Sequence, residues 1–308
     1  MKKKFHKVNI EISNICNLQC SFCPEVVRSK KLMPVELFEK IIAQLQDLTD
    51  QVCFHLMGEP LVHPQLPQLV EICHKYQMPV FFVSNGVLLR PHLAEPLLHP
   101  TIRQVNFSLH SFFDNHPGKD PSTYLEKIFE FTEKAFQQRP DLYVNYRLWN
   151  LNDPRGSLTD NTEMLQKIQQ RFDFKDHLDL DVRFRKSLRI KNRLYLHYDT
   201  EFVWPDLEQK ILGTEGFCYG LSSHFGILVD GTVVPCCLDK EGKIPLGNVA
   251  SEAILDILNN SQAQQILQGF KKRQLINPLC QRCNYIERFS KTSTKSATEV
   301  NPDTVTDL

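Results

Sequence analysis

The chain alternates between short runs rich in Val, Ile, Phe and Tyr and longer segments whose apolar residues recur every three or four positions. The short runs have the composition that β-strands favour, and the longer segments have the periodicity of amphipathic helices. We predict strands at 8–13, 51–57, 79–85, 104–110 and 141–149, and helices at 33–48, 64–77, 91–99 and 122–138.

A further helix is predicted to begin near Asp160, which forms a capping-box pair with Glu163. Residues 186–202 alternate in apolar character and can supply a sixth strand. Regular alternation of strands and helices predicts parallel strands with right-handed crossovers, either in a barrel, complete or partial, or in a doubly wound sheet. In both folds, ligands bind beyond the C-terminal ends of the strands.

The pattern changes after about Gly213. Residues 224–229 and 232–237 flank Asp230-Gly231, a strong hairpin turn signal, and a helix is predicted from Ser251, its N-cap, to Arg273. The end of the chain is polar and is predicted to be disordered. We therefore expect three parts: a first domain at 1–212, a small α+β domain at 213–289 and a disordered tail at 290–308.

The composition is that of a globular protein of 308 residues, with 42% hydrophobic residues. Its 36 Lys and Arg balance 36 Asp and Glu, so no overall positive field favours nucleic acid as a partner. The basic N-terminus lacks the apolar region of a secretory signal, and no apolar run reaches the ~18 residues that span a membrane. We expect a cytoplasmic protein without a membrane partner.

Ten cysteines are the unusual feature of the composition, and most of them are clustered. In a reducing compartment, clustered thiols indicate metal binding rather than disulfides. Cys16, Cys20 and Cys23 form a CxxxCxxC motif directly after the first predicted strand. Soft thiolates favour iron–sulfur or zinc sites, but structural zinc takes four ligands and this loop offers three. A [4Fe–4S] cluster held by three cysteines keeps one iron open for another ligand.

In this position the motif resembles that of the radical S-adenosylmethionine (SAM) superfamily, and the resemblance covers about residues 7–180. It implies a partial (β/α)6 barrel of the TIM type and a SAM-binding [4Fe–4S] cluster, with Phe22 beside the adenine. It also implies that an external one-electron donor, such as flavodoxin or ferredoxin, drives cleavage of SAM to a 5′-deoxyadenosyl radical. That radical would take a hydrogen atom from a small-molecule or peptide substrate.

Two further motifs follow the second and third predicted strands. Met57-Gly58-Glu59-Pro60 resembles the family's GGEP motif, with Met57 in place of the first glycine, and is implied to hold the amino group of SAM. Ser84-Asn85-Gly86 resembles the family's polar turn near the SAM ribose, although a plain turn explains Asn85-Gly86 equally well. The cofactor-binding residues expected from these motifs are Gly58, Glu59, Pro60, Ser84 and Asn85.

The fourth and fifth strands carry three more candidates. Ser108 matches a serine that lies near the SAM carboxylate in the family, whereas His110 stands where relatives often have aspartate. His110 is the candidate catalytic residue, able to contact substrate or move a proton, with a hydrogen-bonded structural histidine as the alternative. Arg147 can pair with the SAM carboxylate through a two-pronged contact.

A second cysteine group lies in the last third of the chain. Cys218, Cys236 and the CxxC pair Cys280 and Cys283 resemble the twitch domain, a shortened relative of the SPASM domain. Four thiolates saturate a [4Fe–4S] cluster and leave no open iron, which suits electron transfer; four-cysteine zinc is the rival. Because the chain has no cysteine after Cys283, we expect one auxiliary cluster.

Three cysteines remain. Cys237 is expected to be a free thiol, with replacement of Cys236 as a ligand left open, and Cys53 and Cys73 are expected in the core. The chain ends in Asp-Leu rather than the Gly-Gly of molybdenum-cofactor cyclases, so we expect a different reaction. An auxiliary cluster that accepts the substrate's electron would give net two-electron oxidation. The alternative function is an iron–sulfur electron-transfer protein without SAM chemistry.

Overall fold

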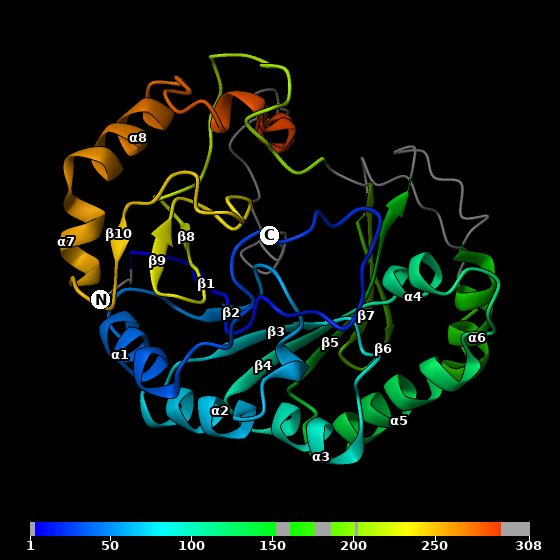
Figure 1. The fold of residues 1–308 in the computed structure, drawn as a ribbon. Helices are drawn as coiled ribbons and strands as arrows, with labels where there is room; N and C mark the ends of the chain where they lie inside the picture. The colour runs from blue at the N-terminus through cyan, green and yellow to red at the C-terminus, as the bar shows by residue number, and fades with distance from the viewer. Residues whose placement is uncertain (1–3, 152–160, 176–185, 201–202, 291–308) are drawn as a thin grey trace, which may run out of the picture.

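The computed structural model describes residues 4–151, 161–175, 186–200 and 203–290. Their strands form a single ten-stranded sheet in the order β10-β9-β8-β1-β2-β3-β4-β5-β7-β6. Figure 1 shows this sheet curving into an open barrel, with the helices on its outer side. The expected partial barrel is therefore confirmed.

The strands divide into a parallel centre and antiparallel edges. The parallel strands are β8 (His224–Ile227), β1 (Lys7–Ile10), β2 (Val52–Phe54), β3 (Val80–Ser84), β4 (Ile102–Ser108), β5 (Tyr143–Leu151) and β7 (Leu194–Thr200). The antiparallel strands are β6 (Ser187–Lys191) on β7, β9 (Thr232–Val234) on β8, and β10 (Gly247–Asn248) on β9.

Helices cover the outer face of the sheet along its whole length (Figure 1). Those beside the parallel strands are α1 (Val35–Leu45), α2 (Leu66–Lys75), α3 (Pro91–Ala94), α5 (Ser122–Gln138) and α6 (Thr162–Phe172). Beyond β10 lie α7 (Ile254–Asn259) and α8 (Ser261–Lys271). The remaining helices are α4 (His110–Asn115), just after β4, and α9 (Glu287–Ser290). Short 3₁₀ segments occupy Pro60–Val62, Glu95–Leu98, Cys280–Arg282 and Asn284–Ile286.

The main core lies between the sheet and the outer helices. Phe38 of α1 packs edge-on against Phe54 of β2, with ring centroids 5.5 Å apart, and Phe107 of β4 packs in the same way on α5. The two isolated thiols are buried as expected, Cys53 at 1% exposure and Cys73 at 0%. Burial of apolar side chains on this outer face supplies the main driving force for the fold.

The inner face of the barrel carries buried polar side chains beside a small apolar group of Cys53, Phe81 and Val83. Asn145 of β5 and Gln104 of β4 both donate to Asn106 Oδ1, at 2.7 and 2.9 Å, and all three side chains are buried. Successive residues of a strand point to opposite faces, so each strand supplies one apolar outer row and one inner row. The inner row makes the open barrel a place for a polar ligand.

Several elements differ in detail from their predictions. In place of one strand at 186–202, the described residues 187–200 form two, β6 and β7, because Asn192 adopts a left-handed turn conformation with φ +49°. The helix expected at 91–99 is α3 followed by a 3₁₀ segment, since Pro96 lacks the N–H that a continuing α-helix needs. Helix α4 was not predicted.

The helix expected from Ser251 to Arg273 is also divided, into α7 and α8. Asn260 ends α7, and its side chain accepts a hydrogen bond from Ala263 N to cap α8. Helix α7 begins after Ala253, so Ser251 is not its N-cap. Helix α6 begins after Asn161, and Asp160 lies outside the described residues.

The C-terminal part joins the barrel through its sheet. Strand β8 pairs in parallel with β1, and the hairpin to β9 turns at Asp230-Gly231 as predicted, with Gly231 at φ +89°. The boundary at 212–213 stays a prediction, and 291–308 lie outside the described residues. Within the described ranges, no helix has the length and apolar character needed to cross a membrane.

Candidate active site

The first cysteine group lies on the loop after β1, at the C-terminal end of the barrel strands. Cys16 is exposed, whereas Cys20 and Cys23 are half-buried. Burial, reinforced by neighbouring charges, raises the pKa of Cys20 to about 11 and that of Cys23 to about 12. The thiols would therefore be protonated at neutral pH unless a cation held them as thiolates, as a metal cluster does.

Hydrogen-bond donors point at two of these sulfur atoms. Asn115 Nδ2 donates to Cys20 Sγ at 3.1 Å, and Leu18 N donates to Cys16 Sγ at 3.4 Å. Asn85 Nδ2 also approaches Cys16 Sγ, at 3.8 Å. Donors around sulfur stabilise thiolate charge and tune iron–sulfur clusters, so this loop fits the cluster that its motif predicts.

Helix α4 fixes the loop in place. The Asp114 carboxylate accepts hydrogen bonds from Ser21 N at 2.7 Å and Ser21 Oγ at 2.5 Å, and Asn115 Oδ1 accepts one from Gln19 N at 2.9 Å. Sequence reasoning missed Asp114 and Asn115 because it did not predict α4. The available signal was their position just after the fourth strand, at the ligand-binding end of the barrel.

The motif after β2 packs directly on the cysteine loop. Gly58 has φ +74°, and a Cβ there would lie 2.3 Å from Ser13 O, so only glycine fits this contact. The Glu59 carboxylate, 1% exposed, accepts hydrogen bonds from Leu61 N at 3.0 Å and Asn85 N at 2.8 Å. Burial raises the pKa of Glu59 to about 7. Glu59 thus ties together the turns after β2 and β3.

The turn after β3 is held by its own side chains. Ser84 Oγ accepts a hydrogen bond from Gly86 N at 2.9 Å, and Asn85 Nδ2 donates to Asn17 Oδ1 at 2.9 Å. The Tyr124 hydroxyl donates to the Asn85 carbonyl at 2.8 Å. These contacts make a rigid turn beside the cysteine loop.

A cavity inside the barrel lies between the cysteine loop and the ends of β2, β4 and β5. Its lining includes six residues singled out from the sequence: Phe22, Cys23, Gly58, Ser108, His110 and Arg147. Glu59, Pro60, Ser84 and Asn85 do not line it. Lining residues that sequence reasoning missed include His55, Trp149 and Trp204, which come from three separate segments. For His55 and Trp149, the only sequence signal was their position near the ends of predicted strands. Trp204 had no such signal.

His110 begins α4 and lies against Phe22, with ring centroids 4.9 Å apart. Its Nδ1 lies 3.1 Å from the Arg147 carbonyl oxygen, a contact in which the ring N–H donates. Burial lowers the pKa of His110 to about 4, so the ring is neutral at physiological pH. These contacts match the hydrogen-bonded histidine considered as the alternative to a catalytic residue.

Arg147 stands beside Ser108, with which it is paired in the β4–β5 register. The guanidinium carbon lies 4.4 Å from the Trp149 ring centroid and 5.7 Å from that of Phe81. The side chain is 4% exposed. A cation held between aromatic rings at a cavity wall is well placed to bind a carboxylate.

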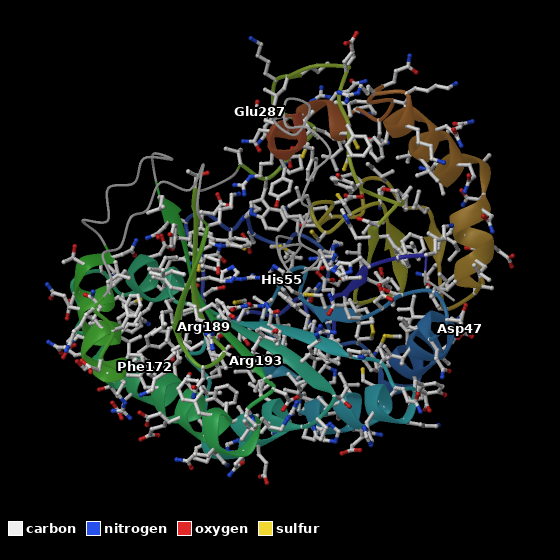
Figure 2. The ribbon with its side chains drawn as sticks, turned by 180° about the vertical axis from the view of Figure 1, so that it is seen from behind. Asp47, His55, Phe172, Arg189, Arg193 and Glu287 are labelled. Carbon is white, nitrogen blue, oxygen red and sulfur yellow. The ribbon has the colours of Figure 1, made fainter. Side chains whose placement is uncertain are left out.

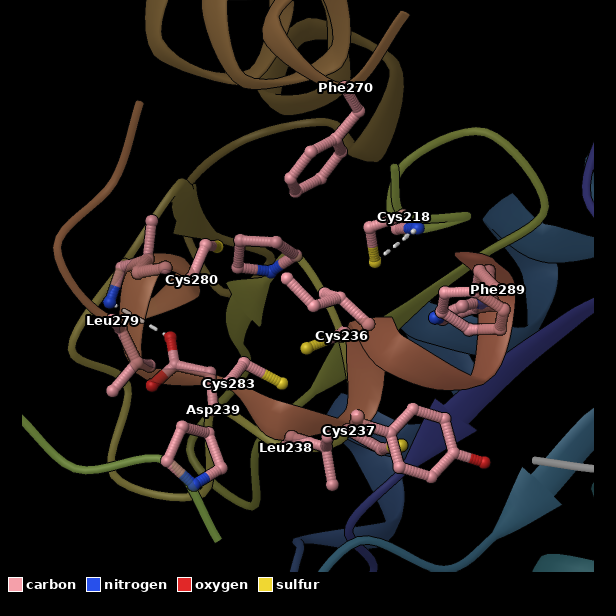
Figure 3. A pocket seen from close by; sticks show the side chains of 17 residues that line it. Cys218, Cys236, Cys237, Leu238, Asp239, Phe270, Leu279, Cys280, Cys283 and Phe289 are labelled. Carbon is pink, nitrogen blue, oxygen red and sulfur yellow. Dashed lines mark hydrogen bonds between the residues drawn. The ribbon is translucent and has the colours of Figure 1, made fainter. Parts of the chain in front are cut away.

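The second cysteine group surrounds an apolar cavity. Figure 3 shows Cys218, Cys236, Cys280 and Cys283 around a common space, with Cys237 at its edge. Burial raises the pKa of Cys218 to about 12. Among the residues that the structure describes, no three His, Cys, Asp or Glu side chains are arranged to hold a single metal ion. Four thiols around one cavity can hold a metal cluster.

Cys237 connects the two sites, because it lines both the barrel cavity and the second cavity. It packs, together with Cys23 and Trp204, against a small apolar cluster that includes Leu56 and Met57. The barrel cavity and the second cavity are thus adjacent, with Cys237 and Leu238 lining both.

Comparison with known proteins gives matches both to the barrel and to the C-terminal part. The profile of the Radical SAM superfamily matches residues 10–153, and that of an iron–sulfur cluster-binding domain, SPASM, matches residues 218–284. GTP 3′,8-cyclase of Chlorobaculum tepidum is 29% identical over 71% of this chain and 68% of its own length. The SAM-dependent 2-deoxy-scyllo-inosamine dehydrogenase of Niallia circulans is 21% identical over 93% of this chain and 95% of its own.

Solved structures share the fold. BtrN, in complex with AdoMet and 2-DOIA, aligns with a TM-score of 0.57 at 19% identity, covering 92% of this chain and 94% of that one. Streptococcus suis SuiB bound to S-adenosylmethionine aligns with a TM-score of 0.61 at 17% identity, covering 94% and 75%. With a cysteine loop at the mouth of its barrel and a second thiol group behind it, this chain belongs to the radical SAM superfamily, as an enzyme with a C-terminal SPASM-type iron–sulfur domain.

Proposed function

We propose that Cys16, Cys20 and Cys23 hold the SAM-binding [4Fe–4S] cluster and that SAM extends from it into the barrel cavity. The observation that carries this proposal is the position of the three-cysteine loop against that cavity, which Cys23 and Phe22 both line. The family's cofactors are SAM, this cluster and an auxiliary iron–sulfur cluster. We assign the auxiliary cluster to Cys218, Cys236, Cys280 and Cys283.

When bound, the first cluster and SAM supply a 5′-deoxyadenosyl radical that takes a hydrogen atom from the substrate, and the second cluster supplies an electron acceptor. The chain's own residues would bind SAM and orient it. Ser108 and Arg147 stand side by side in the β4–β5 register and would take the SAM carboxylate, and the backbone at Gly58, which lines the cavity, would take the SAM amino group. Phe22 offers an aromatic face to the adenine. The neutral His110 ring positions Phe22.

Of the possible reactions, net two-electron oxidation of the substrate has specific support. The second thiol group offers four cysteines, enough to saturate a cluster and reserve it for electron transfer. Its cavity lies beside the barrel cavity, with Cys237 lining both, so an electron would have a short path from substrate. The dehydrogenase relative from Niallia circulans matches the chain over nearly its whole length.

The substrate is a small molecule or a peptide. Relatives of both kinds match, among them GTP 3′,8-cyclase and, over 32% of this chain, the PqqA peptide cyclase of Streptomyces rochei. An external one-electron donor of the flavodoxin or ferredoxin type would reach the first cluster from the side of Cys16, which is exposed. We also propose a division near residue 212 between the barrel and the auxiliary cluster domain.

The test is SAM cleavage by anaerobically reconstituted protein reduced with dithionite. We expect 5′-deoxyadenosine from the wild-type protein and none above background from Cys16→Ala. The Cys73→Ala variant is the matched control, because Cys73 lies in α2, in the outer core and outside both thiol groups. Wild-type protein that binds iron but yields no 5′-deoxyadenosine would favour the electron-transfer alternative.

A further inference from the structure

The barrel cavity has an apolar wall made of side chains that take no part in the proposed SAM contacts. Five of the residues that line the cavity form this wall: Leu56 and Met57 after β2, Trp204 after β7, and Cys237 and Leu238 after β9. Leu56, Met57 and Leu238 are only 1%, 5% and 8% exposed. Burial raises the pKa of Cys237, so none of the five side chains carries a charge at neutral pH.

The apolar wall is held in place by the packing behind it. Leu56 and Met57 belong to one buried apolar cluster, against which Trp204 and Cys237 pack. The segment of Trp204 is tied down by hydrogen bonds, because Gln209 Nε2 donates to the Trp204 carbonyl at 2.9 Å and the Gln209 carbonyl accepts from Arg282 Nε at 2.7 Å. Segments from the barrel and from beyond β7 thus meet in one fixed surface.

His55 adds a single neutral polar group beside this wall. It lines the cavity and lies in the middle of the molecule in Figure 2. Burial, and after it the charges of Arg147 and Lys7, lower the pKa of His55 to about 3, so the ring is neutral. No described residue forms a hydrogen bond with this ring. A neutral imidazole offers one donor and one acceptor, which suits one uncharged polar group of a ligand.

An apolar ligand group fits this wall better than an anion or a polyol does. A charged or hydroxyl group placed against it would lose its water and find no hydrogen-bond partner in return. Binding pockets typically combine apolar walls with a few polar groups that fix orientation, as His55 can do here. Glu11 and Asp199 are buried carboxylates of the barrel, but neither lines this cavity and each is paired with an arginine.

We propose that the apolar wall and His55 form a subsite that holds an uncharged apolar group of the substrate. The proposal rests on the proposed function, because it leaves Phe22, Gly58, Ser108 and Arg147 to SAM. The substrate class is a peptide with an aromatic or branched aliphatic side chain, or a small molecule with a group of that kind. The bound group would contact Cys237, which is next in sequence to Cys236, an assigned ligand of the auxiliary cluster.

Anaerobic calorimetry on the SAM-saturated holoenzyme tests the subsite. The apolar probes are p-cresol, a small molecule, and N-acetyl-leucinamide, a peptide fragment; myo-inositol and malonate are the polyol and the anion. We expect the wild-type protein to bind at least one apolar probe and neither of the other two. Trp204→Ala should weaken that binding about tenfold or more, because one methylene in an apolar pocket already changes discrimination by about 10- to 200-fold. Trp204→Phe, which keeps an aromatic ring, should lose less.

The control is Leu207→Ala, an exposed residue of the same segment that lines neither cavity, which should bind the probe as wild type does. Binding of N-acetyl-leucinamide alone would support a peptide, and binding of p-cresol alone a small aromatic molecule. Equal probe affinity in Trp204→Ala and wild type would overturn the subsite. So would a wild-type protein that cleaves SAM yet binds neither apolar probe, or binds myo-inositol or malonate more tightly. A wild-type protein that does not cleave SAM would contradict the proposed function instead.

Discussion

At the scale of single residues, the cysteine loop depends on side chains far from it in sequence. Asn115 contacts it twice, donating to Cys20 Sγ and accepting from Gln19 N, and Asp114 binds Ser21. The CxxxCxxC spacing was enough to predict the ligands, because thiolate chemistry is a property of the residues themselves. The spacing does not predict the role of Asn115, because that role depends on helix α4, which lies against the loop.

Replacing Asn115 with alanine should weaken the first site without unfolding the barrel. The variant loses the N–H donor to Cys20 and one anchor of the loop, and loss of such an outer contact typically costs about 10- to 100-fold in activity. The rate of 5′-deoxyadenosine formation measures the effect. Asn259→Ala, an exposed asparagine of α7, is the control. An unchanged rate in Asn115→Ala would show that the sulfur contact is not used.

Replacing Gly58 with alanine should abolish SAM binding. The new methyl group would meet Ser13 O and Asn14 Cα, both backbone atoms of the loop before Cys16, and the positive φ adds strain of about 1 kcal/mol or more. Calorimetric titration with SAM measures the loss. Gly118→Ala is the matched control, because Gly118 also has positive φ but its Cβ would enter open space. Similar SAM affinity in the two variants would contradict the close approach.

At the scale of elements, apolar periodicity predicted where strands and helices occur but not where they are interrupted. The outer faces of β1 to β5, and the faces of α1, α2 and α5 that pack on them, are buried as their patterns require. The breaks at Pro96 and Asn260 come from local chemistry that a regular apolar period does not contain. Helix α4 has only six residues, too few to display a period.

The Asn260 break predicts a measurable capping energy. Asn260 accepts from Ala263 N at 2.9 Å and donates to Leu246 O at 2.6 Å, so it caps α8 and ties it to the strand region. Asn260→Ala should lower the free energy of unfolding by about 1–2 kcal/mol. Thermal unfolding followed by circular dichroism measures this loss, with Asn259→Ala as the neighbouring control. Equal stability of the two variants would mean that the cap contributes little.

At the scale of the whole molecule, a partly buried ion pair joins the segment after the cysteine loop to the C-terminal part. The Arg28 guanidinium donates to both oxygens of Glu11, at 3.0 and 2.8 Å, and to the Lys240 carbonyl at 2.9 Å. Glu11, which follows β1, also accepts from Val229 N at 2.9 Å. The sequence could predict two cysteine groups on one chain, but not this link, since it joins residues 212 and 218 positions apart.

Arg28→Met should destabilise the protein by about 3 kcal/mol at pH 8, because it strands the Glu11 charge. Burial already raises the pKa of Glu11, and loss of Arg28 would raise it further. A carboxyl whose pKa is raised on folding stabilises most when protonated, so stability is lost as pH rises. The variant should therefore be less destabilised at pH 5.5 than at pH 8 in thermal unfolding. Arg103→Met, an exposed arginine of β4, is the control.

The reverse trend, a variant that loses more stability at pH 5.5 than at pH 8, would show that Glu11 is not the stranded charge. An Arg28→Met protein as stable as Arg103→Met at both pH values would show that the link between the two parts is not important for stability.

The central claim is that the chain holds one open cluster that binds SAM and one closed cluster that does not. Electron paramagnetic resonance of the reduced protein, with and without SAM, tests it most directly in two variants. In Cys280→Ala/Cys283→Ala the remaining signal should change on addition of SAM. In Cys16→Ala/Cys20→Ala/Cys23→Ala a cluster signal should remain and stay unchanged. A signal in this triple variant that shifts with SAM, or the absence of any signal there, would contradict the assignment.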